Sequence, residues 1–154
     1  LGPQQYDWLV KELKKAQPYR YRFVFMYIPL YDPGTGPYQL GHSLKNKKVA
    51  EQLNALFDKN RVTMVFTAHV HGYYAGTWHK TPFTITGGAG AELGCTDPEH
   101  YFYHYIKVNV TPDGVQYQVE KVGTPFSNIV SLFVHNLSEF SHSYLKAHWD
   151  YFLL

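Results

Sequence analysis

In the first half of the chain, a segment with apolar residues at helical spacing is followed by a continuous apolar run. This pair of patterns occurs twice. Residues 4–16 carry apolar side chains three or four apart after Pro3, which predicts a helix. Residues 22–28 are almost wholly apolar and predict a central strand that is covered on both faces. A second helix is expected over residues 43–59, with Ser43 as its N-cap, followed by a strand at 62–67. This order predicts an α/β fold with a parallel or mixed sheet and flanking helices.

The second half of the chain has a different pattern. Residues 82–86 predict a short strand that leads into a glycine-rich turn at 87–94. Residues 102–110 and 115–122 alternate between apolar and polar side chains, and Pro112-Asp-Gly lies between them. Because this tripeptide favours a tight turn, the two segments predict a late antiparallel hairpin.

The last segment, residues 124–154, predicts a long C-terminal helix. From Ile129 onward its apolar residues again lie three or four apart, and residues 124–138 include no charged side chain. Docking on the body of the protein is the favoured interpretation. The alternatives are a homodimer through this helix or an approach to a membrane anchor, although the basic face typical of membrane-surface helices is missing.

Composition narrows the classes of protein to consider. A chain of 154 residues suits one domain, and 17% charged with 18% aromatic residues is typical of a globular protein. Lys and Arg are spread along the chain, so there is no nucleic-acid-binding signature. The single cysteine, Cys95, excludes an intrachain disulfide and a cysteine-based zinc site. Since the first residue is Leu1 and a helical pattern begins at once, we expect a piece of a longer polypeptide.

The candidate chemistry lies at the end of the predicted strand 62–67. Ala68-His69-Val70-His71-Gly72 places two imidazoles two residues apart, and neutral imidazole is the commonest metal ligand in proteins. On a regular strand both would share a face and serve one site, whereas a turn would let them diverge toward two ions. Two histidines in an exposed turn are the alternative, and spacing alone does not decide between these interpretations.

Four segments together resemble the calcineurin-like metallophosphoesterase family, including its purple acid phosphatase branch. Residues 65–73 are similar to the Gly-His-x-His motif of the family, and residues 23–32 to its His-x-Pro strand and loop. Residues 5–13 resemble the helix before that strand, and residues 85–91 the strand and glycine turn after the histidines. The resemblance implies that residues 1–123 form the C-terminal half of a four-layer αββα sandwich.

The implied activity is the hydrolysis of phosphate mono- or diesters at a dinuclear metal centre. By the resemblance, His69 binds one ion, while His71 binds the other or contacts both the ion and the nucleophile. Two divalent or trivalent ions are expected in the full-length protein, and histidine with carboxylate ligands suits zinc, manganese or iron. The resemblance also favours an exported or periplasmic location.

The chain departs from the family pattern at three points. The remaining metal ligands of the family lie upstream of residue 1, so the fragment alone is expected to be inactive without the missing N-terminal half of the domain. Tyr27 stands where the family has a metal-binding histidine, and a phenol binds metal well only beside a strongly polarising ion such as ferric iron. Ala68 replaces a glycine of the motif. A degenerate, non-catalytic binding module of the same fold is therefore the alternative function.

Other candidates are weaker and concern the mouth of the substrate site. These are the loop residues Tyr31, Asp32 and His42, together with Tyr73 after the histidines. Asp32 is equally well explained as a turn residue before Pro33, and His42 as an exposed loop histidine.

Overall fold

The computed structural model describes residues 2–33, 41–94 and 97–123. Contacts divide the chain into two compact units, Leu1–Tyr101 and Phe102–Leu154, which are considered one at a time. The predicted C-terminal helix at 124–154 lies outside the described residues. It stays a prediction, as does a domain boundary at residue 123.

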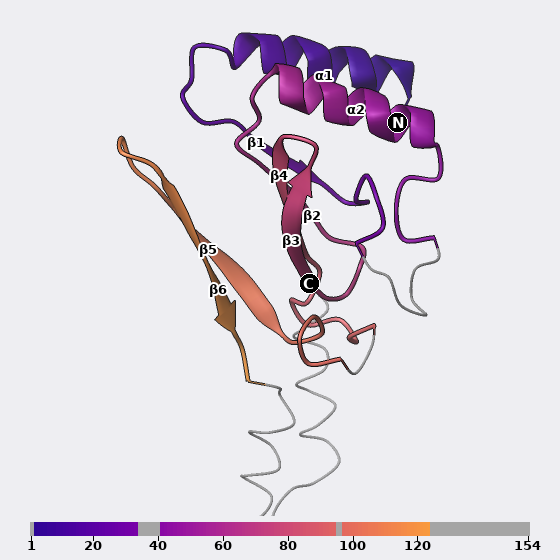
Figure 1. The fold of residues 1–154 in the computed structure, drawn as a ribbon, viewed down its shortest axis with the longest axis vertical. Coiled ribbons are helices and arrows are strands. Elements are labelled where there is room, and N and C mark those ends of the chain that lie inside the picture. Colours follow the sequence, from indigo (N-terminus) through magenta and orange to yellow (C-terminus); the bar gives the residue numbers. More distant parts are fainter. Residues whose placement is uncertain (1, 34–40, 95–96, 124–154) are drawn as a thin grey trace, which may run out of the picture. The chain divides into compact units, whose positions relative to one another are not determined.

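The first unit is a four-stranded mixed sheet with two helices beside it (Figure 1). Its elements in chain order are α1 (Pro3–Lys15), β1 (Phe23–Met26), α2 (Lys47–Lys59), β2 (Met64–Thr67), β3 (Tyr73–Trp78) and β4 (Thr81–Thr86). The strand order is β1-β2-β4-β3, in which β1, β2 and β4 are parallel and β3 is antiparallel to β4. The mixed α/β sheet predicted from the sequence is confirmed.

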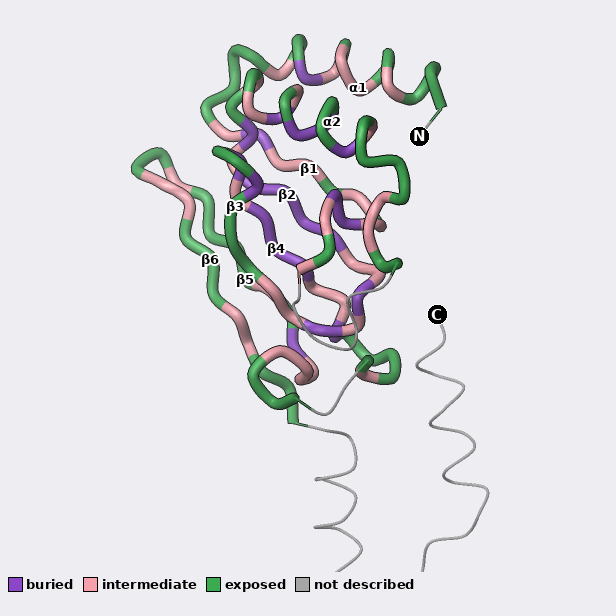
Figure 2. The backbone as a smooth tube through the Cα atoms, turned by 45° about the vertical axis from the view of Figure 1, so that its right-hand side comes forward, coloured by how far each residue is buried: buried purple, intermediate pink, exposed green. Residues whose placement is uncertain are grey.

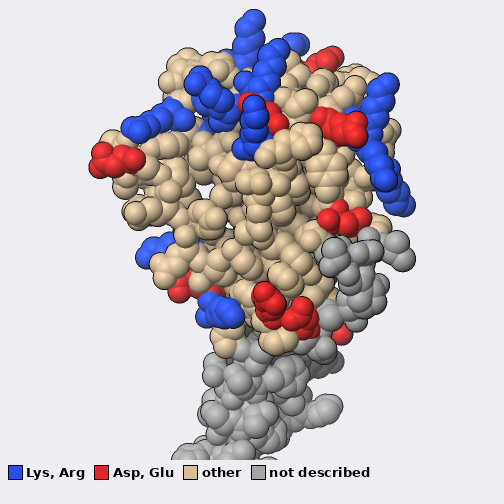
Figure 3. Space-filling view, viewed as in Figure 1, with Lys and Arg blue, Asp and Glu red and all other residues tan. Residues whose placement is uncertain are grey.

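The core lies between the helices and one face of the sheet. Leu13 of α1 and Phe57 of α2 belong to one buried cluster with Val65 and Ile85 of the sheet. All four residues of β2 are buried, and Figure 2 shows the buried colour concentrated along β2 and β4. The lysines of α1 and α2 are exposed, and Figure 3 shows Lys and Arg gathered over the helical end of the unit. The helices therefore turn a charged face to solvent and an apolar face to the sheet.

The prediction that residues 22–28 form a central strand covered on both faces is wrong for the described residues. In the structure β1 lies at the edge of the sheet, and the side chain of Phe25 is 76% exposed. Its ring stacks on that of Phe66 in β2, with centroids 5.2 Å apart. A continuous apolar run predicts two covered faces, but among the described residues the ring of Phe25 on the outer face stays exposed.

The predicted start of the second helix is also corrected. The helix begins at Lys47, and the side-chain oxygen of Asn46 accepts a hydrogen bond from the backbone N–H of Val49 at 3.2 Å. The hydroxyl of Ser43 instead donates to the carboxylate of Asp32 at 2.9 Å. Asn is as good an N-cap as Ser, so the composition of this segment fits either position.

The sequence did not predict β3, although the strand at 82–86 is confirmed as β4. The two strands form a hairpin whose two-residue turn is His79-Lys80, and His79 adopts a positive φ of 51°. Such turns are usually marked by Asn or Gly, which are absent here. Stacking of Trp78 on Phe83, with centroids 4.2 Å apart, stabilises the hairpin beside its turn.

The second unit contains an antiparallel pair, β5 (His104–Val110) and β6 (Val115–Lys121), which confirms the predicted hairpin. The N–H of Thr111 donates to the carbonyl of Gly114 at 2.9 Å and closes the turn. Among the described residues, no helix is long and apolar enough to cross a membrane.

Candidate metal centre

The backbone turns sharply where β2 ends. The N–H of Ala68 still donates to the carbonyl of Tyr27 at 3.0 Å, which continues the pairing of β2 with β1. The N–H of Val70 then donates back to the carbonyl of Ala68 at 2.7 Å, closing a three-residue turn around His69, whose φ is 59°. A non-glycine residue at the centre of such a turn is uncommon and strained, and this kind of strain clusters at functional sites.

A second three-residue turn follows around His71. The N–H of Gly72 donates to the carbonyl of Val70 at 2.8 Å. That carbonyl lies so close to Gly87 that an added Cβ there would meet its oxygen at 2.1 Å, and the N–H of Gly87 donates to the carbonyl of Gly72 at 3.1 Å. The two histidines therefore project from a tightly turned loop, so the geometry of a regular strand, with both rings on one face, does not apply.

The ring of His71 is oriented by a backbone carbonyl. Its Nδ1 lies 2.7 Å from the carbonyl oxygen of Glu92. Because a carbonyl only accepts, Nδ1 must carry the proton, and the lone pair of the neutral ring is then on Nε2. Metal-binding histidines commonly donate their other ring N–H in this way. The N–H of Gly94 also donates to the carbonyl of His71 at 3.2 Å, which holds the two loops together.

The ring of His69 lies in a different environment. Its Nδ1 is buried and has no hydrogen-bond partner among the described residues. The ring of Tyr27 approaches it edge-on with centroids 5.0 Å apart, and the ring of His42 lies 5.4 Å away at an interplanar angle of 54°. The structure thus brings Tyr27, which stands at the family's metal-ligand position, and the substrate-mouth candidate His42 to the ring of His69.

The other substrate-mouth candidates have structural partners. Tyr31 packs edge-on against the ring of Trp78, with centroids 6.0 Å apart. Asp32 accepts the hydroxyl of Ser43, and Tyr73 donates its backbone N–H to the carbonyl of His100 at 2.7 Å. Their proposed contact with a substrate stays a prediction.

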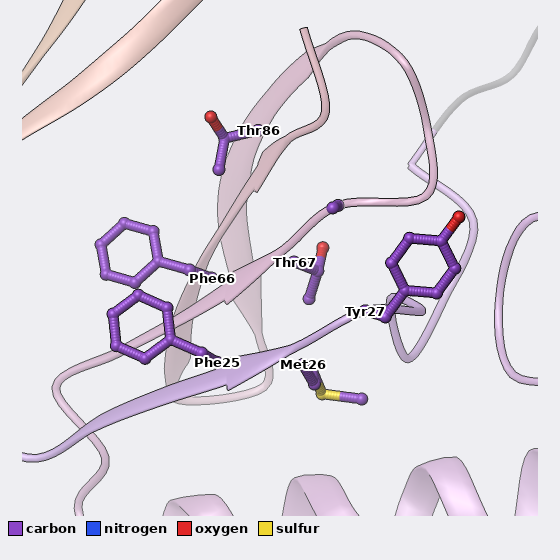
Figure 4. Close-up of a pocket in the computed structure, with 7 residues that line it drawn as sticks. Phe25, Met26, Tyr27, Phe66, Thr67 and Thr86 are labelled. Atoms are coloured by element: carbon purple, nitrogen blue, oxygen red, sulfur yellow. The ribbon is translucent and has the colours of Figure 1, made fainter. Parts of the chain in front are cut away.

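An open hollow of about 350 Å³ lies at the carboxyl ends of β1 and β2 (Figure 4). The rings of Phe25 and Phe66 lie together on one side of it, and the ring of Tyr27 lies on the other. The lining residues are Phe25, Met26, Tyr27, Phe66, Thr67, Ala68 and Thr86. This wall is largely apolar and includes the residue directly before His69. The hollow is therefore suited to the organic group of a ligand whose polar group reaches the imidazoles.

The donor set fits part of a metal centre. A buried ring nitrogen without a partner at His69 and an available Nε2 at His71 are what metal ligation by imidazole needs. Within the described ranges, no three His, Cys, Asp or Glu side chains are placed to hold one ion.

Comparison with known proteins supports the fold. No protein-family model matches the chain. Its structure is similar to that of purple acid phosphatase PPD1 from yellow lupin (Lupinus luteus) seeds, with a TM-score of 0.52 and 16% sequence identity. The match covers 77% of this chain and 26% of that chain, so the protein spans about a quarter of the phosphatase that it resembles. At this identity the similarity concerns the fold alone: the chain is similar in architecture to part of a purple acid phosphatase.

Proposed function

We propose that this chain supplies part of the active site of a metal-dependent phosphoesterase, which hydrolyses phosphate mono- or diesters at a dinuclear transition-metal centre. The observation that carries the proposal is the strained loop at the end of β2, which presents His69 and His71 with ring nitrogens available to a metal. Similarity of the fold to a purple acid phosphatase supports the same reaction class.

Each residue near the centre has a stated part in the proposal. His69 and His71 hold zinc, manganese or iron ions, which when bound supply charge stabilisation and activation of water. The Glu92 carbonyl fixes the ring of His71, and Gly87 leaves room for the Val70 carbonyl behind the loop. The side of the hollow formed by Tyr27, opposite Phe25 and Phe66, receives the organic group of the ester.

The open face of the sheet supports the remainder of the proposed four-layer sandwich. The exposed ring of Phe25 stacks on the buried ring of Phe66 and forms an aromatic patch on the face away from the helices, and exposed aromatic patches mark interaction surfaces. We propose that a second sheet, from polypeptide outside this chain, packs on this patch and carries the missing carboxylate ligands.

The experiment uses the longer gene product. Bound metal is measured by mass spectrometry and hydrolysis is followed with p-nitrophenyl phosphate. His69→Ala and His71→Ala should each lower kcat/KM by at least about 100-fold, since loss of even an indirect metal contact costs 10–100-fold. His79→Ala, an exposed histidine in the β3–β4 turn, is the matched control and should leave both readouts unchanged. A protein that binds no transition metal, ignores phosphate esters and is indifferent to His69→Ala would contradict the proposal.

A second function is favoured by one residue, Tyr27. A phenol in place of the metal-binding imidazole fits a degenerate module that keeps the fold for binding and has lost catalysis. If Tyr27→His raised the metal content and the activity of the longer protein, this alternative would be supported. High activity with Tyr27 in place would exclude it.

A further inference from the structure

His69 has a polar atom whose bonding needs are unmet by the rest of the described chain. Its Nδ1 is buried and has no hydrogen-bond partner among the described residues. Leaving such a buried atom unsatisfied is costly, so the native environment is expected to supply a partner. The rings of Tyr27 and His42 are its aromatic neighbours, and neither forms a hydrogen bond with this atom.

The separation of the two imidazoles matches shared ligation of one ion. A ring nitrogen lies about 1.1 Å from the ring centroid and binds zinc at about 2.0–2.1 Å, so two imidazoles on one tetrahedral ion have centroids roughly 5 Å apart. The centroids of His42 and His69 are 5.4 Å apart. The rings are also tilted by 54°, which excludes face-to-face stacking as the reason for their proximity.

The backbone keeps His42 beside the end of β1. The residue after it, Ser43, donates its hydroxyl to the carboxylate of Asp32 at 2.9 Å. The N–H of Leu44 donates to the carbonyl of Pro29 at 3.0 Å. These two bonds connect the segment that follows His42 to the segment that follows Tyr27, so both residues are presented to the same histidine.

We propose that His42 supplies the imidazole that is missing at Tyr27, and that His42 and His69 together bind one divalent transition-metal ion. The inference rests on the proposed function, because it concerns the same centre. Imidazole is the commonest metal ligand among protein side chains, whereas a phenol binds a metal well only beside a strongly polarising ion. Tyr27 then borders the ion without binding it, and the ion gains its other ligands from solvent or from polypeptide outside this chain.

Cobalt(II) titrated into the 154-residue chain tests the assignment, because imidazole ligation changes its visible d–d absorption. His42→Ala and His69→Ala should each weaken cobalt binding by at least about 10-fold. His79→Ala should change it by less than about twofold, because this exposed ring lies in the β3–β4 turn. Circular dichroism checks the fold of each variant, and His42→Gln, which keeps a polar side chain, should behave as His42→Ala.

A rescue variant separates ligation from packing. Adding Tyr27→His to His42→Ala returns an imidazole near His69 and should restore cobalt affinity to within about threefold of the unmodified chain. A merely structural role for His42 predicts no such rescue.

The outcomes distinguish this inference from the proposed function. Cobalt binding that survives His42→Ala but is lost in His69→Ala overturns the role of His42 and leaves the phosphoesterase proposal intact. Failure of the unmodified chain to bind cobalt also overturns the inference. If both variants lose cobalt binding and the longer protein hydrolyses no phosphate ester, the inference is supported and the proposed function is contradicted.

Discussion

His71 is held in one tautomer by the carbonyl of Glu92, which accepts from Nδ1 at 2.7 Å. We expect the neutral ring of His71 to carry its proton on Nδ1, because the carbonyl cannot donate. Long-range proton–nitrogen NMR measures this directly, and the His71→Ala spectrum assigns the signal. A ring protonated on Nε2 would show that the hydrogen bond to Glu92 is not formed in solution.

Gly87 is the residue at which a single methyl group should disturb the loop most. An added Cβ would lie 2.1 Å from the carbonyl oxygen of Val70, so the backbone must shift. Gly87→Ala is expected to lower the free energy of unfolding by about 1–3 kcal/mol, as for other overpacked sites. Urea denaturation measures the change.

The matched control for that substitution is Gly114→Ala. No atom lies within 4 Å of an added Cβ at Gly114, and its φ is not in the positive region. We expect a change within about 0.5 kcal/mol. Equal losses in the two variants would mean that the contact at Val70 is not the cause.

At the scale of single residues, the sequence indicated the two histidines as candidate metal ligands. It did not indicate the backbone features that orient their rings. His69 and His71 are placed at the end of a buried strand, as their position after residues 62–67 predicts. The carbonyl of Glu92 belongs to the backbone and is common to every residue, so no side-chain pattern marks it. The positive φ of His69 is likewise hidden, because glycine and not histidine is the usual signal for that conformation.

At the scale of single elements, the start of α2 depends on Asn46. Its side chain accepts the N–H of Val49, so Asn46→Ala should lower the free energy of unfolding by about 1 kcal/mol. Ser43→Ala removes only an exposed hydrogen bond to Asp32 and should cost less than about 0.5 kcal/mol. Thermal unfolding followed by circular dichroism compares the two. A larger loss in Ser43→Ala would place the cap where the sequence first suggested.

The positions of the helices were easier to predict than whether another layer packs on each face of a strand. The apolar period of residues 4–16 matches α1 to within one residue at each end. A helix can be recognised from the spacing of the apolar residues on its own buried face alone. Strand β1 was recognised, yet its outer face was expected to be covered. Apolar side chains such as Phe25 signal that a cover is needed, and they cannot show whether this chain provides it. Strand β3 was not predicted, because Gly76 interrupts the strand pattern of the sequence and the following turn lacks Asn or Gly.

For the molecule as a whole, the open side of the sheet should govern association. Phe25 is 76% exposed and stacks on the buried ring of Phe66, so the ring of Phe25 faces solvent on the side of the sheet away from the helices. We expect the 154-residue chain to self-associate at high concentration and Phe25→Ser to shift it toward monomer, because association buries this surface. Light scattering coupled to gel filtration measures the mass of both.

The control for this surface is Trp8→Ser, which removes an exposed aromatic side chain from α1 in the helical layer. This substitution should change the molecular mass measured by light scattering only slightly if the sheet face is the associating surface. Joined to the longer polypeptide, Phe25 should instead be buried by the second sheet, and Phe25→Ser should then cost at least about 1.5–3 kcal/mol of folding free energy. A strictly monomeric chain, combined with no loss of stability in the longer protein, would mean that nothing packs on this face.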